Sequence, residues 1–121
     1  MKILAFTDIH GDHDQLTNLK RKAEHADITI CAGDITNYGH DITGMINDLN
    51  SFPTPVYTIH GNHDDRQELT NLCLTHNNTT MLHKQLIDTE THHLIGYGGE
   101  GFSFTTDDFE SFIKHTDLPT D

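Results

Sequence analysis

The sequence lacks any apolar run long enough to cross a membrane, which takes about 20 residues. Its opening, MKILAFTDIHGD, reaches charged residues too early for a secretory signal. Repeats, linkers and low-complexity segments are absent as well, and 121 residues are enough for one domain and too few for two. We therefore expect a cytoplasmic protein that does not enter a membrane.

Cysteine is scarce, with Cys31 in an apolar run and Cys73 in a segment of helical period. Two cysteines so far apart exclude a disulfide framework and a CxxC metal knuckle. We expect both to be small buried hydrophobic residues.

Basic residues are few: seven Lys and Arg face nineteen Asp and Glu, a formal charge of −12. This balance argues against a broad surface for nucleic acid or anionic lipid, and hence against nuclease action. Two causes compete for the acidity, a metal site that needs local carboxylates and an acidic surface suited to a high-salt interior. The bias towards Asp and Thr along the whole chain favours the surface as the larger cause.

Three apolar runs are present, at residues 2–7, 28–32 and 55–60. They have strand length and do not alternate, which predicts strands buried on both faces. Segments of helical period separate them, at 14–26 and 41–52. Strands alternating with helices predict an α/β fold with a parallel sheet and right-handed crossovers.

The pattern changes in the second half of the chain. A third helix is predicted over 64–76, and KQLIDTETHHLIGYGG then predicts a β-hairpin. A terminal helix is expected within 105–116, where three apolar residues have helical spacing.

Polar clusters follow each of the three predicted strands: TDIHGDHD, GDITNYGHD and GNHDDR. Ligands of open parallel sheets bind beyond the carboxyl ends of the strands. We therefore expect these loops to bring together five side chains, those of Asp8, His10, Asp34, Asn62 and His63.

Carboxylate, imidazole and amide groups form a ligand set for Mn²⁺, Fe or Zn²⁺, whereas Ca²⁺ would require more carboxylates. Asp8 and His10 are two apart and can point the same way from an extended loop, and Asp34 can bridge two ions. Close backbone approach is allowed by three glycines, Gly11, Gly33 and Gly61.

The same clusters resemble those of the calcineurin-like metallophosphoesterases, whose pattern runs DxH, GD and GNH[DE]. The matching segments here are Asp8-Ile9-His10, Gly33-Asp34 and Gly61-Asn62-His63-Asp64. Each segment alone is a weak signal, but all three in order after predicted strands are specific. The resemblance implies a partial version of that family's layered fold and hydrolysis of a small phosphodiester or phosphomonoester.

The resemblance also implies a role for each residue. Asp8 and His10 would bind one divalent metal ion, Asp34 would bridge two, and Asn62 would bind the second. Two such cations lower the pKa of a shared water and supply hydroxide for attack on phosphorus. His63 would be the catalytic residue, contacting the phosphoryl group and the leaving oxygen rather than a metal.

Two residues are expected to support His63. Asp64 would be an orienting carboxylate, and Asn37 stands where many relatives have an aspartate. An amide stabilises an imidazolium less well than a carboxylate does, so we expect a weaker general acid and a preference for good leaving groups. The other histidines are interpreted as structural or surface residues, among them His83, with a distant substrate contact as the alternative for His13.

Two later motifs of the family, an isolated histidine and a GHxH pair, do not occur, since Gly39-His40 continues with Asp41-Ile42. We therefore expect residues 1–121 to be an incomplete, amino-terminal portion of the domain, with at most one metal ion bound well and some apolar surface exposed. We expect this portion alone to be weakly active or inactive unless another chain or self-association supplies the missing ligands. The alternative function is a non-catalytic or truncated fragment that acts by association, with another chain or as a homo-oligomer.

Overall fold

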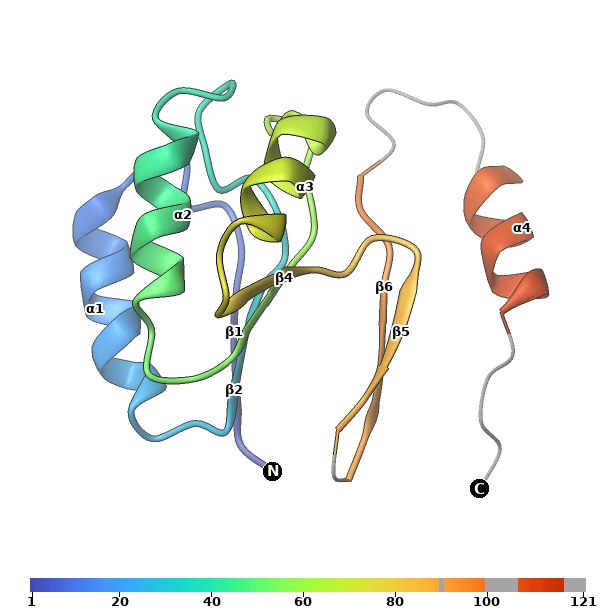
Figure 1. The fold of residues 1–121 in the computed structure, drawn as a ribbon, viewed down its shortest axis with the longest axis horizontal. Coiled ribbons are helices and arrows are strands. Elements are labelled where there is room, and N and C mark those ends of the chain that lie inside the picture. The colour runs from blue at the N-terminus through green and yellow to red at the C-terminus, as the bar shows by residue number, and fades with distance from the viewer. Residues whose placement is uncertain (90, 100–106, 117–121) are drawn as a thin grey trace.

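The computed structural model describes residues 1–89, 91–99 and 107–116, and its centre is a four-stranded parallel sheet (Figure 1). The strand order follows the sequence, which confirms the predicted α/β fold. The strands are β1 (Ile3–Phe6), β2 (Ile28–Cys31), β3 (Val56–Thr58) and β4 (Thr79–Met81).

Three helices connect successive strands and lie together on one face of the sheet (Figure 1). They are α1 (His13–Ala23), α2 (Ile42–Asn50) and α3 (Arg66–Leu74). The most buried side chains lie between this helical layer and the sheet, including Leu16, Met45, Ile46, Leu49 and Leu69. Their helical spacing in the sequence is what gives each helix one apolar face.

The opposite side of the sheet carries the predicted hairpin, β5 (Gln85–Asp88) and β6 (His93–Gly96), followed by α4 (Asp107–His115). α4 is held by stacking of Tyr97 on Phe109 and Phe112, at ring-centroid distances of 4.9 and 5.6 Å. Residue 90 of the hairpin and residues 105–106 of the predicted helix lie outside the described residues.

Two expectations about the strands were wrong. β4 was not predicted, because its three residues, Thr79 to Met81, form no apolar run and gain their strand conformation by pairing with β3. β1 is not buried on both faces but alternates, and Ile3 remains 44% exposed. β1 is an edge strand, with β2 as its neighbour in the sheet, and sequence alone does not show which strand takes the edge.

Both cysteines are buried and free, as expected. Burial raises the pKa of the Cys31 thiol to about 12 and that of Cys73 to about 11. Both thiols are therefore protonated and unreactive at neutral pH. Within the described residues, no helix is long and apolar enough to span a membrane.

Candidate metal centre

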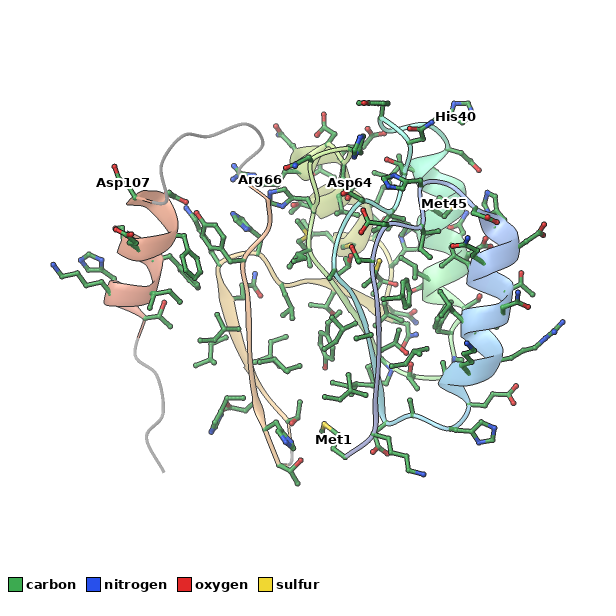
Figure 2. All side chains as sticks on the ribbon, turned by 180° about the vertical axis from the view of Figure 1, so that it is seen from behind. Met1, His40, Met45, Asp64, Arg66 and Asp107 are labelled. Atoms are coloured by element: carbon green, nitrogen blue, oxygen red, sulfur yellow. The ribbon has the colours of Figure 1, made fainter. Side chains whose placement is uncertain are left out.

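The loops that follow β1 and β2 run side by side beyond the carboxyl end of the sheet. Backbone hydrogen bonds continue between them after the strands have ended, which holds the two loops in register. The bonds run from the N–H of Asp8 to the carbonyl of Gly33 (3.3 Å), from His10 to Asp34 (3.0 Å) and from Gly11 to Ile35 (2.7 Å). Figure 2 shows the loop with His40 and the loop with Asp64 at the end of the molecule opposite Met1.

Three candidate residues have left-handed backbone conformations: φ is 61° at Asp8, 50° at His10 and 51° at Asp34. This region costs roughly 1–2 kcal/mol for a residue with a side chain, although Asp and His enter it more readily than most. Such conformations concentrate at functional sites, where surrounding hydrogen bonds impose them. The paired loops provide those bonds here.

His10, Asp34 and His63 form a group whose ligand atoms lie within 4.8 Å of one another, with His10 exposed and the other two half-buried. The rings of His10 and His63 are perpendicular, with centroids 5.0 Å apart. Nδ1 of His63 is buried without a hydrogen-bond partner among the described residues and lies 3.4 Å from Asp34 Oδ1. An unpaired imidazole nitrogen beside a carboxylate fits a divalent cation, which would satisfy both.

Asp8 lies at the edge of this group. Its Oδ1 is 3.4 Å from His10 Nε2, and its carboxyl group also interacts with Asp34. Asn62 is in the same loop as His63, and its Oδ1 would be 2.9 Å from a Cβ placed on Gly99. The metal-binding roles of Asp8 and Asn62 stay predictions.

The charge of Asp34 is favoured in the folded protein. Burial raises the pKa of its carboxyl, but the backbone N–H of His63 and the side chains of Asp8 and His63 lower it more, so the net pKa is below the usual value. An ionised carboxylate at neutral pH is the form that binds a metal ion.

Two glycines allow the loops after β2 and β3 to approach closely. A Cβ on Gly33 would lie 2.8 Å from the backbone nitrogen of Gly61, and a Cβ on Gly61 would collide with the Asp34 side chain. Gly33 also has φ of 93°, which favours glycine. The two loops therefore approach each other closely at these glycines, and an approach of their backbone to a ligand or metal stays a prediction.

Asp64 joins two of the loops. Its Oδ2 accepts hydrogen bonds from the N–H groups of Gly61 (2.9 Å) and Ile35 (3.3 Å), and its Oδ1 accepts from that of Thr36 (3.1 Å). Besides Asp34, Tyr38 from the loop after β2 contacts the His63 ring, with ring centroids 4.6 Å apart. Sequence reasoning missed Tyr38, although an aromatic residue in the polar segment GDITNYGHD was a usable signal.

Two histidines outside the group differ from simple surface residues. His13 bridges Asp48 and Asp41, with Nε2 2.7 Å from Asp41 Oδ2. His83 is half-buried rather than on the surface: its Nδ1 accepts a hydrogen bond from the Gly98 N–H at 2.8 Å, and its ring packs against that of His60.

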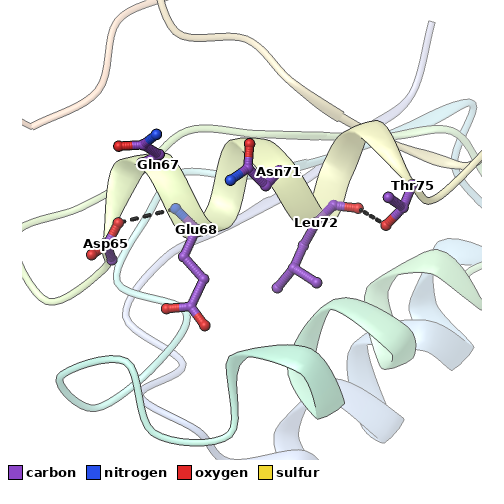
Figure 3. A pocket seen from close by; sticks show the side chains of 6 residues that line it. All are labelled: Asp65, Gln67, Glu68, Asn71, Leu72 and Thr75. Carbon is purple, nitrogen blue, oxygen red and sulfur yellow. Dashed lines mark hydrogen bonds between the residues drawn. The ribbon is translucent and has the colours of Figure 1, made fainter.

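A separate open depression of about 500 Å³ lies along α3 (Figure 3). At the helix start, Asp65 Oδ1 accepts a hydrogen bond from the backbone N–H of Glu68 at 3.0 Å. The depression is lined by Asp65, Gln67, Glu68, Asn71, Leu72 and Thr75. Among the described residues, the side chains suited to a metal ion gather at the sheet edge and not in this depression.

Comparison with known proteins agrees with this geometry. The family described as Calcineurin-like phosphoesterase matches residues 1–121. The crystal structure of TT1561 of Thermus thermophilus is similar, with a TM-score of 0.69 and 21% identity over 81% of this chain and 48% of that one. Another crystal structure has a TM-score of 0.77 and 17% identity over 93% of this chain and 62% of its own.

These structural similarities establish the fold. The chain spans about half to two thirds of the length of the two structures. None of the curated proteins matches the sequence significantly.

Proposed function

Because the chain belongs to the calcineurin-like phosphoesterase family, we propose that it binds divalent metal through His10 and Asp34, beside His63, and hydrolyses a small phosphate ester. The observation that carries the proposal is the convergence of these side chains at the carboxyl ends of neighbouring strands. A parallel sheet binds its ligands at this edge. The substrate is a small phosphodiester or phosphomonoester, since the net charge of −12 opposes a polyanionic one.

Asp8, His10 and Asp34 would hold one ion, and Asp34 and Asn62 would contribute to a second. Oxygen and imidazole donors together suit Mn²⁺, Fe or Zn²⁺. When bound, such an ion supplies a nucleophile near neutral pH by lowering the pKa of water. The lowered pKa of Asp34 supports its role, because the carboxylate is ready to bind without losing a proton.

His63 would contact the phosphoryl group. Its side chain is half-buried beside Asp34, and its backbone N–H donates to Asp34 Oδ1 at 2.9 Å, so its position is tied to the metal ligand. An imidazole placed there can stabilise charge on the leaving oxygen or donate a proton to it. The competing assignment is that His63 binds the metal ion. The metal affinity of a His63 variant distinguishes the two roles.

The second candidate function is a fragment that acts by association with another chain. It is favoured by the small ligand set, because the described residues hold one group of three or more His, Cys, Asp or Glu side chains suited to a metal. The exposed Ile3 on the edge strand is a place where a partner could pack.

Metal stoichiometry and hydrolysis test the two candidates together. The purified chain is titrated with Mn²⁺ by calorimetry and assayed with bis(p-nitrophenyl) phosphate, beside Asp34→Asn and the surface control Asp14→Asn. If the chain is an enzyme on its own, Mn²⁺ binding and hydrolysis are both measured, lost in Asp34→Asn and kept in Asp14→Asn. Mn²⁺ binding without hydrolysis would favour the fragment, and no binding would overturn the metal-dependent function.

A further inference from the structure

The geometry points to Tyr38 as a substrate-facing aromatic surface beside His63, which stacks on a planar aromatic group in the organic part of a phosphate ester. This inference rests on the proposed function and adds the class of substrate. It would make Tyr38 a specificity-determining residue, because an alkyl ester of the same phosphate would lack the stacking contact.

The exposure of Tyr38 is the first observation. Its side chain is 81% exposed, whereas Tyr57 and Tyr97 are half-buried. A single exposed apolar residue is ordinary, and Leu74 at the end of α3 is equally exposed. Exposure alone therefore does not distinguish Tyr38 from an ordinary surface residue. The backbone conformation of Tyr38 does.

Tyr38 occupies a backbone position that disfavours it. The N–H of His40 donates to the carbonyl of Asn37 at 3.2 Å, which closes a tight turn with Tyr38 and Gly39 at its centre. Their φ angles are 55° and 81°. Turns with two left-handed central residues favour Asn, Asp or Gly at these positions, and a bulky aromatic there is costly. Since the exposed ring gains little burial in return, strain of this kind indicates a role in function.

The turn is fastened to the loop that holds His63. Thr36 is fully buried, and its hydroxyl accepts a hydrogen bond from the Gly39 N–H at 2.9 Å. The same hydroxyl lies 3.2 Å from both the His63 carbonyl and Asp64 Oδ1. The backbone of the turn that carries Tyr38 is therefore tied to the His63 loop.

The ring of Tyr38 lies next to His63, the proposed catalytic residue. It meets the His63 ring edge-on, at 4.6 Å between centroids and 70° between planes. A phosphate held by His63 and the metal ligands would place its ester group near the exposed part of Tyr38. Across the three loops, residues 8–13, 33–41 and 61–66, Arg66 is the one Lys or Arg residue, and the exposed ring of Tyr38 offers an aromatic contact to that group. Stacking of this kind changes affinity by about tenfold.

Binding measured by calorimetry on the full chain with Mn²⁺ tests the inference. The ligand pairs are phenyl phosphate against methyl phosphate, and adenosine monophosphate against ribose phosphate. Tyr38→Asn removes the ring and suits the left-handed backbone, Tyr38→Phe keeps the ring, and Leu74→Asn is the matched control for loss of an exposed apolar side chain.

We expect the natural chain to prefer the aromatic ligand of one or both pairs by about tenfold. Tyr38→Asn should lose this preference with unchanged affinity for the non-aromatic ligand, while Tyr38→Phe and Leu74→Asn retain it. Phosphate binding without aromatic preference, or a preference that survives in Tyr38→Asn, would overturn the inference alone. If neither these ligands nor inorganic phosphate bind, the proposed function fails and the role of Tyr38 fails with it.

Discussion

His63 interacts with one carboxylate oxygen of Asp34 through both its backbone N–H and its imidazole ring. Asp34 Oδ1 accepts a hydrogen bond from the His63 backbone N–H at 2.9 Å and lies 3.4 Å from Nδ1 of the same residue. The backbone bond does not depend on the histidine side chain. Replacement of the imidazole therefore separates its chemistry from the position of the loop.

His63→Gln should keep the Mn²⁺ affinity within a few-fold of the natural chain and lower the rate of phosphate ester hydrolysis by about 10²–10⁴-fold. The reason is that the proposed ligands Asp8, His10 and Asp34 would remain, while the imidazole proposed to serve the leaving oxygen would be lost. Calorimetry and a hydrolysis assay give the two quantities. A large loss of Mn²⁺ affinity in this variant would instead assign His63 as a ligand.

Asp64 should matter more for stability than its acidic neighbour. Asp64→Ala leaves the N–H groups of Gly61, Ile35 and Thr36 without their acceptor, and each unpaired buried group costs about 1–3 kcal/mol. Asp65→Ala removes one helix cap, to the Glu68 N–H, and should cost about 1 kcal/mol. Urea unfolding of both variants gives the comparison, and equal losses would contradict the joining role of Asp64.

The sequence was sufficient to place Asp8, His10 and Asp34 near one another, because each follows a segment whose apolar content fixes it as a strand. Parallel strands end at the same edge, so the loops after them must meet. The sequence could not show that Tyr38 contacts His63, since this depends on a turn whose direction is set by the buried Thr36.

Dependence on the tertiary structure also explains why β4 was not predicted and why the exposure of β1 was not. β4 contains two β-branched threonines, which favour a strand, but three residues without an apolar run are too short a signal, and its pairing with β3 defines it. The exposure of Ile3 in β1 depends on which layers cover the sheet, a property of the whole fold rather than of the local segment.

His13 should stabilise the protein more in mild acid than in base. Its hydrogen bonds to Asp48 and Asp41 raise the pKa of the imidazole above the usual 6.5. The folded protein therefore holds this proton more tightly, and the stabilisation is present below about pH 6.5 and lost as pH rises through the folded value. His13→Gln should lower the melting temperature at about pH 5.5 and have less effect at about pH 8.5.

Salt provides a second check, because His13 is exposed and its ion pairs are screened. The effect of His13→Gln should shrink in high salt, whereas His25→Gln, at an exposed position in the turn after α1, should show neither dependence. Equal effects of His13→Gln at both pH values would contradict the ion-pair account.

His83 should have the opposite effect from His13 on the pH dependence of stability and destabilise the protein in acid. Burial, followed by the positive charge of His60 and Arg66, lowers the pKa of His83 from 6.5 to about 4. Below about pH 6.5 the unfolded chain binds the proton first, so the free energy of unfolding falls as pH decreases towards about 4. Burial lowers the pKa of His60 as well, which adds to the same trend.

His83→Asn tests this contribution, because the asparagine amide oxygen can accept the Gly98 N–H bond that Nδ1 accepts now, without titrating. Urea unfolding of metal-free protein across this pH range should show a weaker loss of stability in acid for His83→Asn than for the natural chain. His25→Asn, on the surface, is the matched control and should leave the slope unchanged. If His83→Asn keeps the full slope, His83 takes up its proton in the folded protein as readily as in the unfolded chain, and burial does not hold it neutral.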